Sequence, residues 1–396
     1  MCVYRTLAIL LTALGTIAAH QNMDYKTLPS SIARFSAKFC NQLPKDKSVV
    51  SSPLSAEFLL ALLTLGTTDP AHSELLTSLG IDNDNDIRTA FSSVSSKLKS
   101  IKGVTLNVAN KVYIQEGPYK LQAQLQKDAV NIFDTAMEKV DFGKSASTVK
   151  AINDWVESKT NNKIKDLLSE DSVDNLTRLV LVNALYFKGT WKNKFNPENT
   201  IEQPFHINAN STVQVPMMYK EDDYAYGFIE ELDAQLLEIS YVGDEASMLI
   251  VLPQEIEGLN GVLQKLADGY DLMSQVEKLT KTKVQVSLPK FKIETEIDLQ
   301  EVLPKLGINA IFRQSKSGIT KLIDTEEELY VSKAVQKAFI EVNEEGAEAA
   351  AATGMVFALR CMPPPMPQFR ADRPFLYLLL GAEQSPLFIG AYRSNA

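Results

Sequence analysis

The chain has 396 residues, of which 45% are hydrophobic and 22% are charged, a balance typical of a folded globular protein with a full core. Its formal net charge is −9, and charges of one sign do not gather in long runs. The composition therefore argues against a nucleic-acid partner, because a protein that grips phosphates needs a basic surface.

The N-terminus has the layout of a secretory signal peptide. Arg5 precedes an apolar stretch that ends at Leu14, and small residues follow up to Ala19. That stretch is too short to span a bilayer comfortably, and no other segment is long and apolar enough, so we expect no membrane association. A buried N-terminal helix is the alternative. We expect residues 1–19 to be removed and residues 20–396 to leave the cell as a single domain.

The three cysteines do not form a disulfide framework. Cys2 belongs to the predicted signal peptide, which leaves Cys40 and Cys361. Cys40 ends a helical apolar pattern and is predicted to be buried, whereas Cys361 lies in a proline-rich stretch and is predicted to be exposed. A bond between these two remains an alternative. With so few cysteines the fold must depend on its core.

Helical patterns dominate the first part of the chain. An apolar run over residues 55–65 follows Ser52 and Pro53, and proline is common in the first turn of a helix. Residues 147–168 form a second amphipathic pattern. Its apolar positions are Val149, Ile152, Trp155, Val156 and Ile164.

Strand patterns follow. Residues 177–187 are a continuous apolar run rich in β-formers, which predicts a central strand buried on both faces. A second such run covers residues 246–252, and the alternation over 284–288 predicts a strand with one solvated face. Early helices and late strands indicate an α+β fold. Further strands are predicted at 337–342, 375–380 and 387–392.

The sequence lacks a recognisable catalytic or metal site. None of the three histidines, His20, His72 and His206, belongs to a zinc-binding pattern. His72 follows a loop-like stretch, and His206 lies in a short strand-like segment. No nucleophile elbow or phosphate-binding loop is present. We therefore expect no enzymatic activity, no metal and no cofactor.

A small basic cluster lies near a predicted helix end. It consists of Lys97, Lys99 and Lys102. A weak site for a sulfated polysaccharide and an ordinary solvated face are both compatible with it.

The connection between the strands predicted at 337–342 and 375–380 is unusually long. Connections of more than ~12–15 residues are uncommon unless they are functional or disordered. By propensity its alanine run favours a helix. The period-2 alternation favours a strand instead, with Glu348 facing outward and small residues that could slide between existing strands. Arg360 is either an ordinary surface arginine or a bait for a trypsin-like protease, which binds arginine through a buried carboxylate.

Five motifs in order resemble the serpin family, and the chain is similar to the secreted antitrypsin-type serpins of insects. The matching residues run over almost all of the mature chain. The motifs are residues 51–55 at the start of the second helix, 181–191 in a central strand, 337–346 before the hinge, 369–375 in the family signature and 386–390 in the last strand.

The resemblance implies about nine helices around three β-sheets, with a reactive-centre loop over about residues 344–374. Counting from Gly346 puts the reactive bond between Arg360 and Cys361. In the family a protease attacks this bond, and the loop then inserts as a new strand and drags the acyl-enzyme along. The implied hinge is Glu344, Glu345, Gly346, Ala347, Glu348, Ala349, Ala350, Ala351 and Ala352.

The resemblance also implies a network near the point where the central strands part. Gln336 stands where many vertebrate serpins have histidine, and its amide can donate and accept hydrogen bonds. Cys361 replaces a usual small residue, and a free thiol beside the reactive bond could oxidise. The implied network and hinge contacts involve Ser52, Ser55, Asn183, Trp191 and Gln336.

Two sequons, at Asn175 and Asn210, fit a secreted chain. Asn210 reads as a turn between strands, and Asn175 adjoins a central strand. The leading hypothesis is a secreted, monomeric suicide inhibitor of a trypsin-like serine protease in a haemolymph-like fluid. The alternative is a non-inhibitory serpin-fold binding or carrier protein.

Overall fold

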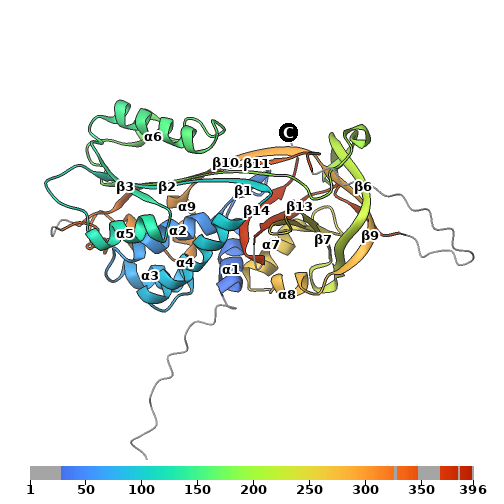
Figure 1. Cartoon of the computed structure of the whole chain (residues 1–396), viewed down its shortest axis with the longest axis horizontal. Helices are drawn as coiled ribbons and strands as arrows, with labels where there is room; N and C mark the ends of the chain where they lie inside the picture. The colour runs from blue at the N-terminus through green and yellow to red at the C-terminus, as the bar shows by residue number, and fades with distance from the viewer. Residues whose placement is uncertain (1–27, 325–327, 347–365, 382–383, 395–396) are drawn as a thin grey trace, which may run out of the picture.

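The structure, a computed structural model, describes residues 28–324, 328–346, 366–381 and 384–394. The expected signal peptide, 1–19, lies outside these residues, as do His20, Arg360, Cys361 and the hinge from Ala347 onward. The described residues form nine α-helices and fourteen strands, which confirms the α+β class. In Figure 1 most helices lie below a five-stranded sheet, and a second, larger sheet lies at the right.

The five-stranded sheet holds the two central strands predicted from the sequence. Its strand order is β10-β11-β4-β2-β3. β4 pairs antiparallel with β2 and parallel with β11, although β4 and β11 are distant in sequence. The bounds are β2 (Val104–Gln115), β3 (Ala136–Val140), β4 (Leu179–Gly189), β10 (Phe291–Asp298) and β11 (Val331–Val342).

Strand β4 is buried on both faces, as predicted. Leu181 and Leu185 pack into the main core, whereas Val180 and Val182 pack into a smaller cluster beneath α6 (Ser145–Lys159). Side chains alternate between the faces of a strand, so a strand covered on both sides must be apolar throughout. Figure 1 shows α6 on the face opposite to the other helices.

The remaining strands form one continuous sheet in the described residues. The resemblance implied three sheets, whereas the hydrogen bonds define two. The reason is the long strand β6, which pairs with β9 and β5 along one part and with β7 near its end. The bounds are β1 (Val49–Ser51), β5 (Ile201–Asn208), β6 (Ser211–Ile229), β7 (Ala234–Ser240), β8 (Ser247–Pro253), β9 (Thr280–Pro289), β12 (Gln368–Arg370), β13 (Phe375–Leu380) and β14 (Pro386–Tyr392).

The first predicted helix is confirmed as α2 (Pro53–Thr64). It begins at Pro53 because the Ser52 side chain caps it by accepting a hydrogen bond from the Ser55 N–H. His72 lies in the first turn of α3, directly after the loop-like stretch that was expected before it. The other helices are α1 (Leu28–Asn41), α3 (Ala71–Leu79), α4 (Asp84–Ser100), α5 (Ala123–Asn131), α7 (Leu259–Ala267), α8 (Met273–Val276) and α9 (Leu299–Val302).

The second predicted helix is too long at its C-terminal end. It was expected to reach residue 168, but α6 ends at Lys159. Ile164 is still buried in the cluster beneath α6, because the chain turns back along the helix. The Asn153 side chain holds this return by donating to the Leu168 carbonyl at 2.8 Å and accepting from the Leu168 N–H at 2.9 Å.

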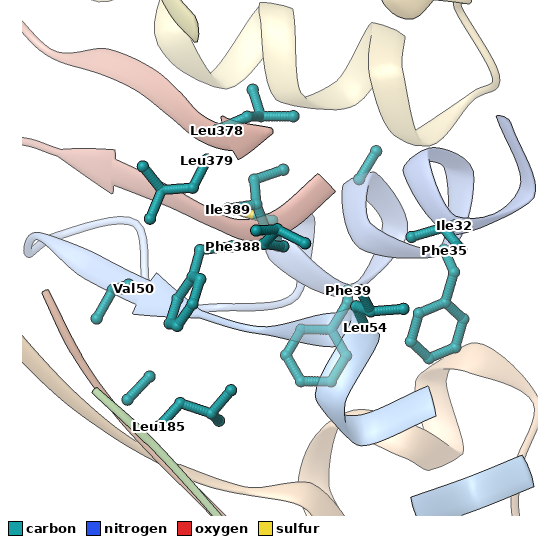
Figure 2. Close-up of a cluster of buried hydrophobic side chains, with 14 of the residues drawn as sticks. Ile32, Phe35, Phe39, Val50, Leu54, Leu185, Leu378, Leu379, Phe388 and Ile389 are labelled. Atoms are coloured by element: carbon teal, nitrogen blue, oxygen red, sulfur yellow. The ribbon is translucent and has the colours of Figure 1, made fainter. Parts of the chain in front are cut away.

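The main core joins α1 and α2 to both sheets. Figure 2 shows Phe39 of α1 and Leu54 of α2 beside each other. In the same view, Phe388 of β14 lies on the side toward Leu185 of β4. Cys40 is buried here as a free thiol, and burial raises its pKa to about 12. Across the described ranges, no helix has both the length and the apolar character to cross a bilayer.

Candidate functional site at the seam between β4 and β11

The parallel pairing of β4 with β11, which we call the seam, is the central feature of the five-stranded sheet. It runs in register from Leu179 beside Val331 to Lys188 beside Glu341, with one irregularity near Lys333. A strand that enters the sheet here must break every backbone hydrogen bond between β4 and β11. New pairs can replace these bonds, so such an insertion extends the sheet rather than disrupting it.

Three amide side chains form a row across the core face of the sheet. Asn110 lies opposite Asn183, and Asn183 lies opposite Gln336. Gln336 Nε2 donates to Asn183 Oδ1 at 2.5 Å, and Asn183 Nδ2 donates to Asn110 Oδ1. The row therefore crosses the seam by a direct side-chain bond.

The N-terminal end of α2 completes this arrangement. Ser52 N–H donates to Gln336 Oε1 at 3.0 Å, and Gln336 Nε2 donates to the Ser52 carbonyl at 2.9 Å. Ser55 Oγ accepts from Asn183 at 2.6 Å and donates to Asn110 at 3.1 Å. We call these five residues the seam network. All are buried, so an unmade bond leaves a desolvated polar group and destabilises the native state.

Four members of the seam network were predicted from the sequence, whereas Asn110 was not. The available signal was weak, because β2 carries two asparagines, Asn107 and Asn110, and only a buried amide needs partners. Periodicity could not reveal which strand would lie beside it.

Trp191 holds the residues that follow β11 at the end of the seam. Its indole Nε1 donates to the Asn343 carbonyl at 2.7 Å, and its backbone N–H donates to the Glu345 carbonyl at 3.0 Å. It also forms a parallel bridge with Gly346. The Trp191 ring stacks on Tyr241 with centroids 4.5 Å apart. The first part of the predicted hinge is therefore anchored beside the continuation of β4.

Ion pairs hold Glu344 and Glu345, the two hinge glutamates that the structure describes. Glu344 pairs with Lys290 at 2.8 Å and accepts a hydrogen bond from Thr200 Oγ1 at 3.0 Å. Burial alone would raise the pKa of the Glu344 carboxyl. The bonds from Lys290 and Thr200 have the larger combined effect, so the pKa of Glu344 is lowered. Glu345 pairs with Lys188 of β4 at 2.7 Å, and this bond raises the pKa of Lys188.

Gly346 approaches a neighbouring backbone closely. A Cβ atom built on it would lie 2.5 Å from Lys194 Cα and 2.6 Å from Lys194 N. No real Cβ fits at such a distance, so any other residue must shift the hinge. Gly346 is therefore required by this contact as well as by the resemblance of its motif.

The comparisons with known proteins match this geometry. A family model described as serpin (serine protease inhibitor) matches residues 30–395. Antichymotrypsin-2 of Bombyx mori is 43% identical over 90% of this chain and 96% of its own length. Antitrypsin of the same species is 42% identical over 95% of this chain and 96% of its own length. Serpin48 of Tenebrio molitor has a TM-score of 0.83 at 35% identity and covers 94% of this chain and 100% of its own.

The chain belongs to the serpin family. Membership confirms the resemblance derived from the five motifs, and it supports inhibition of serine proteases. The relatives carry the names of protease inhibitors rather than of catalysts. Among the described residues of this serpin, no group of three or more His, Cys, Asp or Glu side chains could hold a metal ion.

The two sequons lie away from the seam network. Asn210 is exposed in the turn between β5 and β6, where the sequence analysis expected a turn. Asn175 is exposed in a turn just before β4, and its carbonyl accepts from Arg178 at 3.0 Å. In this serpin a glycan at Asn175 would therefore stand near the beginning of the seam.

The basic cluster also lies apart from the hinge. Lys97 and Lys99 are in the last turn of α4, and Lys102 follows it. Lys99 pairs with Asp134 at 3.4 Å, which neutralises part of the cluster. A surface pair of this kind contributes little to stability.

Proposed function

We propose that this serpin is a secreted suicide-substrate inhibitor of trypsin-like serine proteases, cleaved between Arg360 and Cys361. The observation that carries the proposal is the seam itself. β4 and β11 pair directly, and the chain that follows β11 begins at the seam's end, where Trp191 holds it. The segment 347–359 is about as long as β11, so a strand made from it matches the site that would receive it.

The chemistry is that of acyl transfer followed by trapping. The protease serine oxygen attacks the Arg360 carbonyl carbon, and the protease histidine passes the serine proton to the departing Cys361 amine. An ester to Arg360 replaces the peptide bond, and water would normally hydrolyse it. Insertion of thirteen residues at ~3.3 Å each moves the ester roughly 40 Å before hydrolysis.

Specificity in the proposal rests on Arg360 alone. An antichymotrypsin and an antitrypsin resemble this chain almost equally. Their names therefore do not choose between target classes. The long cation of Arg360 suits a specificity pocket with a carboxylate at its base, as in trypsin.

Incubation with trypsin tests the proposal. We expect a covalent complex that survives hot detergent, and a released C-terminal fragment that starts at Cys361 by mass measurement. Arg360→Ala should abolish complex formation. In Ala351→Pro the bait is intact but the inserting strand is interrupted, because proline cannot donate to a central ladder. This variant should be cleaved after Arg360 and release active trypsin.

A carrier-type serpin would give a different result. If the parent chain is cleaved after Arg360 and releases active trypsin, the inhibitory proposal is wrong. Cleavage without a rise in heat stability would then favour a non-inhibitory binding or carrier protein.

We further propose that residues 1–19 direct secretion, that the mature serpin is monomeric, and that Asn210 carries a glycan. Mass measurement of the secreted protein tests the new N-terminus and the glycan together. For the basic cluster, a structural neighbour is titled native protease nexin-1 with heparin. Salt-dependent retention on heparin, lost on substitution of Lys97 and Lys102, would support a polysaccharide site.

A further inference from the structure

A short turn lies at the beginning of the seam, directly before β4. Asp174 Oδ1 accepts hydrogen bonds from the Leu176 N–H at 2.9 Å and from Thr177 Oγ1 at 3.1 Å. The Asp174 N–H in turn donates to Thr177 Oγ1 at 2.9 Å. These bonds fix the turn and bury Thr177, whereas Asn175 and Leu176 at its tip are exposed.

This turn is tied to both central strands. Tyr330, directly before β11, donates its hydroxyl hydrogen to the Leu176 carbonyl at 2.9 Å. The Arg178 N–H donates to Ser332 Oγ of β11 at 2.9 Å. A strand that occupies the whole length of the seam must pass between these partners, so both bonds break at the last step of a complete insertion.

Chain length brings the end of an inserted strand to this turn. β11 has 12 residues, and the segment 347–359 has one residue more. A strand that starts after Gly346 and runs back along β11 therefore brings Arg360 to about the level of Tyr330. In the proposed mechanism, the protease held by the ester at Arg360 then stands against residues 174–176.

Asn175 meets the requirements of an N-glycosylation acceptor. Its side chain is exposed, and Thr177 supplies the hydroxyl two positions later. Within the described ranges, hydrogen bonds reach only the Asn175 carbonyl, which accepts from Arg178 Nη1 at 3.0 Å, and not its side-chain amide. A glycan on that amide therefore leaves the folded turn intact and extends into solvent.

We propose that Asn175 carries an N-linked glycan, and that this glycan limits the completion of insertion. The glycosylated chain is then cleaved as a substrate more often than the bare chain, and it traps the protease less often. Attachment of the glycan does not depend on the proposed inhibitory function, whereas its effect on trapping rests on that function.

The effect is a competition between two rates. Water hydrolyses the ester at Arg360 and releases active protease, unless insertion is completed first. A glycan is bulky, and at Asn175 it occupies the space beside Leu176 and Tyr330 that the protease has to enter. The barrier to the last step of insertion rises, while the barrier to hydrolysis stays the same. More inhibitor molecules are therefore consumed for each protease that is trapped, although the first cleavage is as fast as before.

The test uses the full chain, secreted from a eukaryotic host that adds N-glycans. Mass measurement of the peptide that contains Asn175 gives the occupancy, and titration of trypsin gives the number of inhibitor molecules consumed per trapped enzyme. We expect this number to be several-fold higher for the parent than for Asn175→Gln. Removal of the glycans from the parent by an endoglycosidase should lower it in the same way, without any substitution. Asn210→Gln, at the exposed sequon between β5 and β6, is the matched control and should leave the number unchanged.

Each part of the proposal has an outcome that would overturn it. An unmodified Asn175 in the secreted chain overturns the site. Occupancy with the same number consumed by the parent, Asn175→Gln and the deglycosylated parent overturns the effect on insertion. An equal change in Asn175→Gln and Asn210→Gln, or a glycan effect confined to the rate of the first cleavage, overturns it as well. A chain that is glycosylated at Asn175 but traps no trypsin, with or without the glycan, counts against the proposed function and not against the site.

Discussion

Gln336 of β11 and Asn183 of β4 lie directly opposite each other, and the Gln336 amide donates to Asn183 Oδ1 at 2.5 Å. This side-chain bond crosses the seam. The other Gln336 bonds go to the backbone of Ser52 at the start of α2. One neutral side chain therefore joins both central strands to the helix beneath them, and the bond must break when the seam opens.

We predict that Gln336→Ala destabilises the native state by about 2–3 kcal/mol, because it leaves Ser52 N–H and other buried polar atoms unpaired. The measurement is denaturant unfolding, together with the rate of spontaneous conversion to a non-inhibitory form, which should rise. Gln126→Ala, an exposed glutamine in α5, is the control and should change stability by less than about 0.5 kcal/mol. Equal effects in both variants would contradict the role assigned to the seam network.

Gln336→His should make stability depend on pH in a way that the parent chain does not. An amide does not titrate, whereas burial lowers the pKa of a histidine below its usual value of about 6.5. A lowered pKa means that the folded state binds fewer protons, so stability is lost as pH falls below about 6.5. The unfolding midpoint should be lower at pH 5.5 than at pH 8 in the variant, and this difference should exceed that of the parent chain. Parallel curves would show that position 336 is solvated.

Trp191→Phe should loosen the hinge. The variant keeps most of the ring packing on Tyr241 but loses the hydrogen bond from Nε1 to the Asn343 carbonyl, at a cost of about 1–2 kcal/mol. Proteolysis near residues 343–346 should become faster. Trp155→Phe within α6, the chain's other tryptophan, is the matched control and should leave hinge cleavage unchanged.

Gly346→Ala should displace the hinge without unfolding the protein. The added Cβ meets the backbone of Lys194, which cannot move aside as a side-chain tip would. Relief requires loss of the bridge to Trp191, at a cost of about 1–3 kcal/mol. Hydrogen exchange at Trp191 N–H and Phe195 N–H, which donate to Glu345 and Glu344, should become faster. Unchanged protection would mean that the backbone accepts the methyl group.

Glu57→Gln should remove a pH-dependent destabilisation. Glu57 is 2% exposed in α2, its Oε2 atom has no hydrogen-bond partner, and burial raises its pKa well above 4.5. A raised carboxyl pKa means that the folded state holds a proton that the unfolded state releases above pH 4.5. Stability therefore falls as pH rises from 4.5 toward the raised pKa.

The Glu57→Gln variant should gain about 1 kcal/mol relative to the parent between pH 5 and pH 8, measured by unfolding midpoints. Glu198→Gln, at an exposed position, is the control. A pH slope equal to that of the parent would show that Glu57 is already ionised in the native state.

Much of the fold was predictable from local patterns. The continuous apolar run at β4 predicted burial on both faces, and Ser52 with Pro53 predicted the start of α2, because both signals depend on neighbouring residues only. The five motifs identified the family, which the comparisons confirmed. Local patterns failed where the chain turns back, as at Lys159, since the buried Ile164 continues a helical period after the helix has ended.

The sequence predicted most of the residues of the candidate site, but not the contacts between them. The sequence by itself determined which residues are small, apolar, amide-bearing or cationic, and through its motifs which family they belong to. Only the tertiary structure decided that Asn110 joins the seam network and that Lys290 and Lys188 hold the hinge. These contacts join residues as far as 284 positions apart, as between Ser52 and Gln336, and their geometry follows from the register of β2, β4 and β11, which no local periodicity encodes.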